Sequence, residues 1–317
     1  MRRRSGPLEN QYTGMIDITH KSPSLRKAIA TATVRVSKPE TIEAVLQRRV
    51  PKGDVFEMAK TAGLFAAKRT HDMIPDCHPL PVEFTAVRYS TGLLEIRIEV
   101  EVHTVYKTGV EVEAMHAASV VALTIYDMLK PIDLEISIEG IRLLEKTGGK
   151  SQMRRMAEAP VPTRVVVCSD SVAAGKAEDR SGGLVADKLQ AWGLAPGQAL
   201  FIPDEPETIA RTCKEAADQG IRLLVFTGGT GLSPRDLTPE ALAPLLDRRI
   251  PGIEEAMRQY GQQRTPYAML SRSVAGMMGE MLVLALPGST RGAAESLDAI
   301  FPALLHVFRV RSGARHE

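Results

Sequence analysis

A segment rich in glycine, charge and proline divides the chain into two halves, and it constrains the fold more than any other feature. Residues 148–162 read GGKSQMRRMAEAPVP. Each proline fixes its own φ and biases the preceding residue towards extended backbone, so residues 152–162 are expected to form a short linker. At 317 residues the chain also exceeds one typical domain. The sequence therefore predicts a solvated tail at residues 1–14 and domains at residues 15–151 and 163–317.

Composition excludes several classes of function. Aromatic residues make up 4% of the chain and the net charge is +2, which argues against stacking platforms or a strong electrostatic surface for nucleic acid. The three cysteines are widely spaced, so a disulfide framework and a cysteine zinc site are not supported, and a reducing cytoplasm is expected. No secretory signal is recognised, and no stretch is judged long enough to cross a bilayer.

The first half combines helical spacing with strand alternation. Ser37 and Glu40 have the spacing of a capping box, which predicts a helix to Arg48. A second helix is expected from Asp54, and its apolar face is predicted to contain Val55, Met58, Ala62 and Phe65.

Further along the first half, the prolines of residues 71–81 predict a stiff, non-helical loop. Residues 94–102 alternate strictly between apolar and charged side chains, as in a half-exposed antiparallel strand. A long helix is expected from Gly109 to Lys130, and another strand is expected around Leu134, Ile136 and Ile138. This order predicts an α+β sandwich.

The second half has a different pattern. Residues 164–168, 223–226 and 281–286 are short, continuous apolar runs flanked by turns and helical segments. Strands that are apolar on both faces belong to a parallel sheet covered by helices on both sides. The sequence therefore predicts an α/β second domain.

Several polar residues of the first half stand where packing does not require them. Lys52 lies at a helix entry, where backbone N–H groups favour anions. Lys68 either contributes to a site or complements the dipole at the end of its helix. His78 lies on the rigid loop, but with His71 it lacks a third metal ligand. The long helix carries Glu113 and Asp127 fourteen residues apart, on one face but ~21 Å apart along the axis.

This separation means that one small substrate cannot contact both carboxylates within one subunit. If both are catalytic, a site shared across a two-fold interface is expected. Asp127 and Lys130 are three residues apart on a helix, which permits either an acid–base couple or an ordinary surface ion pair.

The motifs of the first half, taken together, resemble those of cyclic pyranopterin monophosphate synthase, the MoaC family, from Met15 to Ser151. The motifs are Lys52-Gly-Asp-Val, Ala67-Lys-Arg-Thr, Ile74-Pro-Asp-Cys-His-Pro-Leu80, Lys107-Thr-Gly-Val-Glu-Val-Glu-Ala114, residues 118–128 and residues 143–151. The resemblance implies a ferredoxin-like fold and a hexamer with sites between subunits. It implies conversion of 3′,8-cyclised dihydro-GTP to cyclic pyranopterin monophosphate and pyrophosphate, without a tightly bound cofactor.

The same resemblance implies roles for individual residues. Asp127 matches the position of the family's catalytic acid/base, and Lys52 and Lys130 match the positions of its catalytic cations. His78 is also expected to take part in catalysis. The expected substrate-binding positions are Asp76, Cys77, His78, Val112, Glu113, Lys68 and Lys107. Asp76 departs from the usual apolar residue, and its carboxylate is expected to point away from a polyanionic substrate.

Two glycine-rich turns mark the second half: Thr227, Gly228, Gly229, Thr230 and Gly231 form the first, and residues 287–290, including Ser289, form the second. Both follow expected strands, at the edge where open α/β sheets bind ligands, and glycine lets backbone N–H groups approach an anion closely. A GTPase or kinase is excluded because GxxxxGK[ST] is missing.

Asp204 and Asp236 also follow expected strands. Two converging carboxylates beside a nucleotide suggest Mg²⁺, which commonly uses one or two carboxylates plus phosphate oxygens. The alternative is that Asp204 caps a helix and Asp236 stabilises a turn.

The second half, from about Thr163 to Arg311, is similar to the MogA/MoaB family of molybdopterin-binding fold. The matching motifs are Ser169-Asp-Ser171, Asp179-Arg-Ser-Gly182, Ile202-Pro-Asp-Glu205, residues 227–241 and Leu286-Pro-Gly-Ser289. The resemblance implies a three-layer α/β domain that adenylylates molybdopterin with ATP and Mg²⁺, with Asp204 and Asp236 catalytic. A molybdopterin-binding module without catalysis is the alternative. A trimeric second half is compatible with one D₃ hexamer of the whole chain.

Overall fold

The computed structural model describes residues 14–149 and 161–311, and these residues belong to two compact units divided after Gln152. Each unit has its own hydrophobic core and is described by itself. Most of the predicted tail (1–14) and linker (152–162) lies outside the described residues, as do Lys150 and Ser151 of the last first-half motif.

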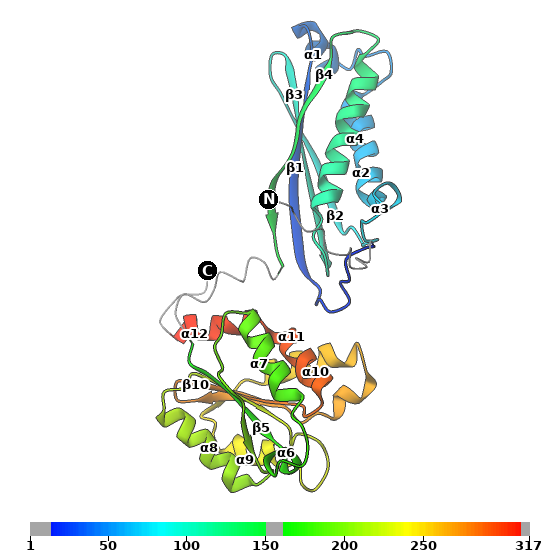
Figure 1. Cartoon of the computed structure of the whole chain (residues 1–317). Helices are drawn as coiled ribbons and strands as arrows, with labels where there is room; N and C mark the ends of the chain where they lie inside the picture. Colours follow the sequence, from blue (N-terminus) through cyan, green and yellow to red (C-terminus); the bar gives the residue numbers. More distant parts are fainter. Residues whose placement is uncertain (1–13, 150–160, 312–317) are drawn as a thin grey trace, which may run out of the picture. The chain divides into compact units, whose positions relative to one another are not determined.

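The N-terminal unit is a four-stranded antiparallel sheet covered on one face by helices (Figure 1). Its elements are β1 (Ser24–Arg35), α1 (Pro39–Leu46), α2 (Val55–Lys68), α3 (Thr70–Met73), β2 (Phe84–Thr91), β3 (Glu95–Tyr106), α4 (Glu111–Leu129) and β4 (Ser137–Thr147). The strand order β2-β3-β1-β4 is that of a ferredoxin-like fold. This confirms the expected α+β class and the ferredoxin-like topology.

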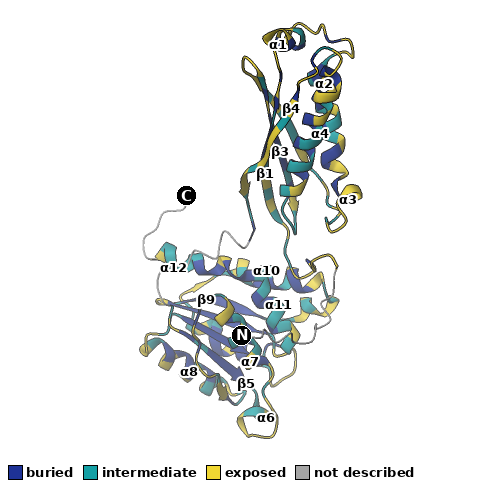
Figure 2. Cartoon of the chain, turned by 45° about the horizontal axis from the view of Figure 1, so that its top comes forward, coloured by how far each residue is buried: buried dark blue, intermediate teal, exposed yellow. Residues whose placement is uncertain are grey.

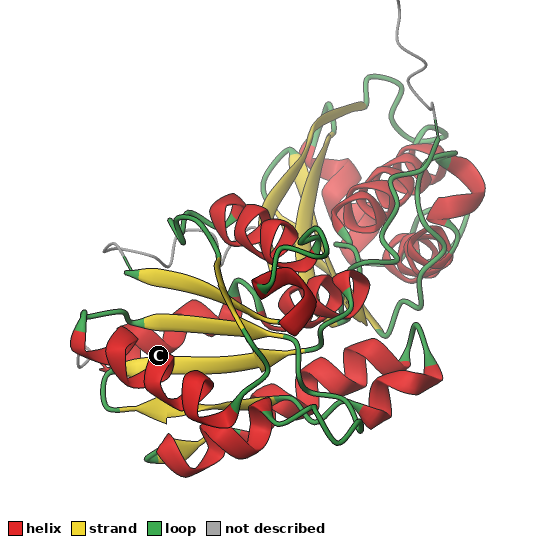
Figure 3. Cartoon of the chain, turned by 60° about the horizontal axis from the view of Figure 1, so that its bottom comes forward, coloured by secondary structure: helices red, strands yellow, loops and turns green. Residues whose placement is uncertain are grey.

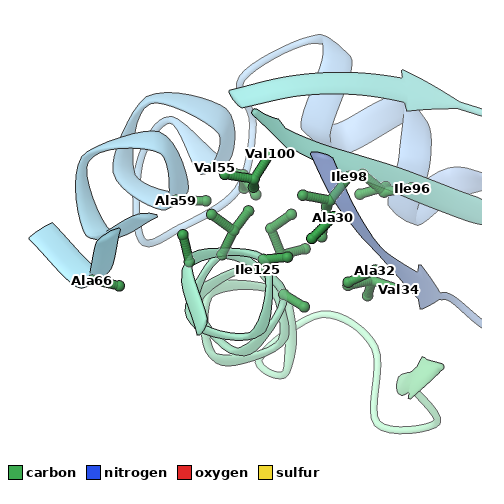
Figure 4. Close-up of a cluster of buried hydrophobic side chains, with 14 of the residues drawn as sticks. Ala30, Ala32, Val34, Val55, Ala59, Ala66, Ile96, Ile98, Val100 and Ile125 are labelled. Carbon is green, nitrogen blue, oxygen red and sulfur yellow. The ribbon is translucent and has the colours of Figure 1, made fainter. Parts of the chain in front are cut away.

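Small side chains allow α2 and α4 to approach the sheet and each other closely. Ala30, Ala32 and Val100 of the sheet are fully buried and lie near Ile125 of α4 (Figure 4). The alternation predicted for residues 94–102 is confirmed in β3, where Ile96, Ile98, Val100 and Val102 face the core. Such aliphatic packing, at about 25 cal/mol per Å² of buried apolar surface, stabilises a core that contains few aromatic residues.

The predicted apolar face of α2 was wrong in part. Met58 and Phe65 are more than half exposed, whereas Ala59 and Gly63 face α4. A Cβ on Gly63 would lie 2.5 Å from Cγ2 of Val121, so the close approach of the helices selects the smallest residues. The predicted start of α2 was correct, because Asp54 accepts a hydrogen bond from the Glu57 N–H at 3.1 Å.

Three other local expectations were also wrong. Ser37 does not cap α1, because its N–H and hydroxyl bind the buried carboxylate of Asp133, and the N-cap is Lys38. That same carboxylate accepts the Glu135 N–H, and the strand expected from Leu134 begins only at Ser137. The loop predicted to be non-helical contains the one-turn helix α3.

The expectation that no stretch is long enough to cross a bilayer was wrong, because α4 is long and apolar enough to do so by length and composition. Its buried residues instead form part of the N-terminal core, as expected for the central helix of a folded domain.

The C-terminal unit is a six-stranded sheet with helices on both faces (Figure 3). In chain order it comprises β5 (Thr163–Cys168), α6 (Asp170–Ala173), α7 (Ser181–Ala191), β6 (Leu200–Ile202), α8 (Pro206–Asp218), β7 (Leu223–Thr227), α9 (Thr238–Leu242), β8 (Arg248–Arg249), α10 (Pro251–Gln262), β9 (Val274–Met278), β10 (Met281–Leu286), α11 (Thr290–Ile300) and α12 (His306–Arg311). Three short 3₁₀ helices, Ala243–Leu245, Pro266–Leu270 and Ala303–Leu305, join some of these elements.

The three apolar runs predicted as strands are β5, β7 and β10, and they pair in parallel as expected. These strands are dark blue in Figure 2 because nearly all their residues are buried. Helices α7, α10 and α11 contribute to the core on one face, and α8 and α9 to the core on the other. The three-layer α/β expectation is confirmed, although β8 and β9 add an antiparallel edge that was not predicted.

Candidate functional sites in the two halves

Lys52, Asp127 and Lys130 form a lysine–aspartate cluster at the C-terminal end of α4. Lys52 Nζ lies 2.7 Å from Asp127 Oδ2, and Lys130 Nζ lies 2.8 Å from Asp127 Oδ1. Hydrogen bonds from Lys130 and then Lys52 lower the pKa of Asp127 to about 2. The carboxylate is therefore ionised at neutral pH, and its side chain is half exposed. The cluster can bind anionic oxygen through the ammonium groups and accept a proton on Asp127.

Cys77, His78 and Glu113 form a cysteine–glutamate cluster at the N-terminal end of α4. The Cys77 thiol donates to Glu113 Oε1 at 3.0 Å, and Glu113 is 2% exposed. Burial raises the pKa of Glu113, and burial together with this hydrogen bond raises the pKa of Cys77 to about 12. Cys77 is therefore a neutral donor rather than a thiolate nucleophile. His78 Nε2 donates to the Ile16 carbonyl at 2.8 Å.

The other predicted substrate-binding residues of this half are near the N-terminal end of α4. Lys107 precedes the helix and Val112 lies in its first turn, 42% exposed. Lys68 ends α2, and two residues later Thr70 Oγ1 lies 3.2 Å from Nδ1 of His116 on α4. Asp76 is exposed.

The two clusters do not meet within one chain. Fourteen residues separate Glu113 from Asp127 on the continuous helix α4, which corresponds to ~21 Å at 1.5 Å per residue. One chain thus carries two partial sites of different chemistry, one with two cations and a base and the other with a protonated thiol bound to a buried carboxyl group.

In the C-terminal unit the two glycine-rich turns touch each other. Gly228 and Gly229 have φ of +107° and +62°, which side chains with a Cβ rarely adopt. A Cβ on Gly228 would lie 2.2 Å from the Cys168 carbonyl oxygen, and one on Gly288 would lie 3.1 Å from the Gly228 Cα. Thr227 Oγ1 also donates to the Pro287 carbonyl at 2.9 Å. The two turns therefore form one backbone surface at the carboxyl ends of β7 and β10.

Ser289 caps α11, where its hydroxyl accepts the Gly292 N–H at 3.1 Å. Beside the first turn lies a cavity of 360 Å³ lined by backbone and by polar side chains of the β5–α7 connection, including Ser169, Asp179 and Arg180. The sequence motifs contained these three residues, but no site role was predicted for them. Their position follows from the parallel pairing of β5 with β7.

Asp204 and Asp236 both reach the first glycine-rich turn. A Cβ on Gly229 would lie 3.1 Å from Asp204 Oδ1, and one on Gly231 would lie 2.8 Å from Asp236 Oδ2. Burial, and then the charge of Asp236, raise the pKa of Asp204. Asp204 does not cap α8, whose N-cap is Glu205, whereas Asp236 does stabilise a turn by accepting the Ser233 N–H at 2.8 Å.

The donor set beside this turn fits a magnesium ion held partly by phosphate. Asp204 Oδ1 is buried without a hydrogen-bond partner among the described residues, which is costly unless a cation or another donor approaches it. In residues 14–149 and 161–311 there is no group of three or more His, Cys, Asp and Glu arranged to hold a metal. Two carboxylates with phosphate and water are what Mg²⁺ commonly uses in nucleotide enzymes.

Fold and sites together define a two-domain protein with candidate site residues in each unit. A MoaC family model matches residues 15–149, and a model described as a probable molybdopterin binding domain matches residues 164–306. The molybdenum cofactor biosynthesis bifunctional protein of Chlorobaculum tepidum is 44% identical over 308 residues, covering 97% of each chain. This chain therefore belongs to the family of bifunctional molybdenum cofactor biosynthesis proteins, with a MoaC part followed by a MogA/MoaB-type part.

Each half also matches shorter proteins. The cyclic pyranopterin monophosphate synthase of Roseiflexus sp. is 49% identical over 145 residues, which are 45% of this chain and 91% of that protein. The solved structure of the molybdopterin biosynthesis enzyme MoaB from Thermus thermophilus is 40% identical. The match covers 49% of this chain and 98% of that one, with a TM-score of 0.46.

Proposed function

We propose that the N-terminal half converts 3′,8-cyclised dihydro-GTP to cyclic pyranopterin monophosphate with release of pyrophosphate. The observation that carries this proposal is the Asp127 carboxylate held between the ammonium groups of Lys52 and Lys130. Rearranging the nucleotide requires proton transfers, for which an ionised Asp127 is an acceptor. The departing pyrophosphate develops negative charge, which the two ammonium groups stabilise.

The cysteine–glutamate cluster completes this site from a second copy of the chain. Glu113 and the Cys77 thiol can hydrogen-bond a neutral purine-derived ring without repelling it. Because ~21 Å of helix separates the two clusters, a two-fold dimer places one cluster of each copy in each site. We infer an assembly of three such dimers, a hexamer, and sedimentation of the full chain as a monomer would reject it.

Pyrophosphate release by the purified full chain from the cyclised nucleotide tests this activity. Lys52→Met and Asp127→Asn are expected to lose about 10²-fold or more in rate. Lys60→Met is a matched control, because Lys60 forms an ordinary helix-surface ion pair with Glu57 at 2.6 Å. Equal activity in all four chains would reject the assignment of Lys52 and Asp127.

We propose that the C-terminal half transfers AMP from ATP to molybdopterin. The buried, unpartnered Oδ1 of Asp204 beside the glycine-rich turns supports this reading, because it suits a nucleotide-bound cation. Asp204 and Asp236 would hold Mg²⁺, which supplies charge neutralisation for the phosphates. The backbone of Gly228 and Gly229 would approach the phosphates closely, and the 360 Å³ cavity beside it would hold the adjoining part of the ligand.

Formation of adenylylated molybdopterin from ATP, followed by mass spectrometry, tests this second activity. Asp204→Asn and Asp236→Asn are expected to abolish it, whereas Asp187→Asn, an exposed change on α7, is not. Binding of molybdopterin without any adenylylated product would instead identify a non-catalytic binding module.

We also infer that the protein acts in the cytoplasm on small pterin ligands. Its three cysteines are all free, and two of them are buried, as is common where thiols stay reduced. Finding the protein in an oxidising compartment by fractionation would contradict this inference.

A further inference from the structure

Arg272 donates hydrogen bonds to four residues on or beside the loop that carries Asp236. It lies between the 3₁₀ helix Pro266–Leu270 and β9, and its backbone N–H donates to the Thr230 carbonyl at 3.1 Å. Its Nε donates to the Gly231 carbonyl at 2.8 Å. Its two terminal nitrogens donate to the Asp236 carbonyl and to the Glu240 carboxylate of α9. One guanidinium therefore binds both ends of the segment from Gly231 to Asp236.

Apart from Arg272, the main side-chain contact that ties this segment to the rest of the described residues is the ion pair of Arg235 with Asp170. Residues 231–235 are all exposed, including Leu232 at 67%, so the segment contributes almost nothing to the hydrophobic core. Within it, the Asp236 N–H and carboxylate bind only the neighbouring backbone of Ser233. Backbone that is exposed and makes few buried contacts opens at low free energy, so the position of the segment depends on the Arg272 hydrogen bonds and on the ion pair of Arg235.

The position of the segment affects both carboxylates of the C-terminal site. Arg235, which directly precedes Asp236 in the segment, forms an ion pair with Asp170. Asp170 Oδ1 in turn accepts the Asp204 N–H at 3.0 Å. A shift of the segment therefore moves the Asp236 carboxylate directly and loosens the backbone of Asp204 through Asp170.

We propose that Arg272 is the positioning residue of the C-terminal site, which fixes the Gly231–Asp236 segment so that the Asp236 carboxylate faces Asp204 across the glycine-rich turn. The proposal rests on the function proposed for this half and names a residue that sequence motifs did not single out. Arginine is required because its planar guanidinium reaches three acceptors at fixed angles, which a single lysine ammonium cannot do.

Hydrogen–deuterium exchange on the unliganded full chain tests the positioning role without any assumption about activity. Arg272→Met and Arg272→Lys are each expected to speed exchange of the amides in residues 231–236 roughly tenfold or more, since charge-assisted hydrogen bonds are lost. Glu240→Gln keeps the guanidinium and is expected to have a smaller effect, so it remains informative if the other variants fold poorly.

Arg222→Met is the matched control. Arg222 also binds one carbonyl and one carboxylate, both of Glu280, but it precedes β7 whereas the glycine-rich turn follows that strand. Its removal is expected to leave exchange in residues 231–236 unchanged. Unchanged exchange in Arg272→Met, or full protection in Arg272→Lys, would overturn the proposal.

Adenylylation kinetics then separate this proposal from the proposed function. Arg272→Lys is expected to lose about 10–100-fold in kcat/KM and to need more Mg²⁺ for half-maximal rate, while pyrophosphate release by the N-terminal half stays unchanged. A wild-type chain without adenylylation would reject the proposed function, and the exchange experiment would still decide the role of Arg272. Wild-type kinetics in Arg272→Lys would reject the positioning role alone.

Discussion

Substitution of Gly228 by alanine perturbs the C-terminal site at its most restricted backbone position. Gly228 has a φ of +107°, and its Cβ would lie 2.2 Å from the Cys168 carbonyl oxygen. Real Cβ atoms essentially never approach a heavy atom closer than 3.0 Å, so the turn must move by about 0.8 Å. The second turn also lies near this position, because a Cβ built on Gly288 would lie 3.1 Å from the Gly228 Cα.

The expected cost has two parts. Left-handed backbone in a residue with a Cβ costs about 1–3 kcal/mol, and the displaced contacts add about 1–3 kcal/mol of overpacking. A shift approaching 1 Å at a phosphate-binding turn is expected to lower the adenylylation rate by about 10²-fold. In a unit of this size, roughly 2–4 °C of melting temperature is lost per kcal/mol.

Gly193→Ala is the matched control for this prediction. Gly193 also has a positive φ, +85°, but a Cβ there meets no atom of the described residues within 4 Å. Calorimetry and adenylylation on both variants separate backbone strain from the clash, and pyrophosphate release reports the N-terminal half in the same sample. Adenylylation by Gly228→Ala within twofold of Gly193→Ala would refute the reasoning.

Three further predictions concern ionisation. Lys52→Met is expected to raise the pKa of Asp127 from about 2 towards its ordinary value. The acid limb in the pH profile of pyrophosphate release is therefore expected to move to higher pH. An acid limb at the wild-type pH would contradict this. Cys77 has a pKa of about 12, so its alkylation by iodoacetamide at pH 8 is expected to be far slower than that of a free thiol. Rapid labelling of Cys77, followed by mass spectrometry, would count against its hydrogen bond to Glu113. Burial raises the pKa of Asp204, so its ionised form destabilises the folded unit; this cost is complete above the folded pKa, shrinks as pH falls through it and is absent below the unfolded pKa. Asp204→Asn is therefore expected to raise the melting temperature at neutral pH while abolishing adenylylation. A lower melting temperature would oppose this.

Elements with strong periodicity could be predicted from the sequence, and those with small residues could not. The charged–apolar alternation of β3 predicts a strand with one buried face. The continuous apolar runs of β5, β7 and β10 predict strands that are buried on both faces. The central strand β1 reads SLRKAIATATVR, where alanine gives no preference for strand over helix. Its buried Ala28, Ala30 and Ala32 are explained only by the helices packed against them.

The candidate sites were predictable only in part for a similar reason. Helical spacing pairs Asp127 with Lys130, but Lys52 is 75 residues away and reaches Asp127 through the packing of α2 on α4. The sequence marked Lys52 as a cation at a helix entry, and the family resemblance supplied its catalytic role. Nothing in the local sequence marks Arg272, because its acceptors are backbone carbonyls whose position depends on the folded loop.

Mixed oligomers test most directly the claim that the two ends of α4 complete one catalytic site between copies. Lys52→Met removes a cation from the lysine–aspartate cluster, and Glu113→Gln alters the cysteine–glutamate cluster, so each variant alone is expected to retain about one hundredth of the wild-type rate or less. In co-expressed chains that pair at random, about one site in four combines two intact clusters. We predict that pyrophosphate release from the cyclised nucleotide recovers to about a quarter of the wild-type rate. A mixture as inactive as either parent would contradict the shared site.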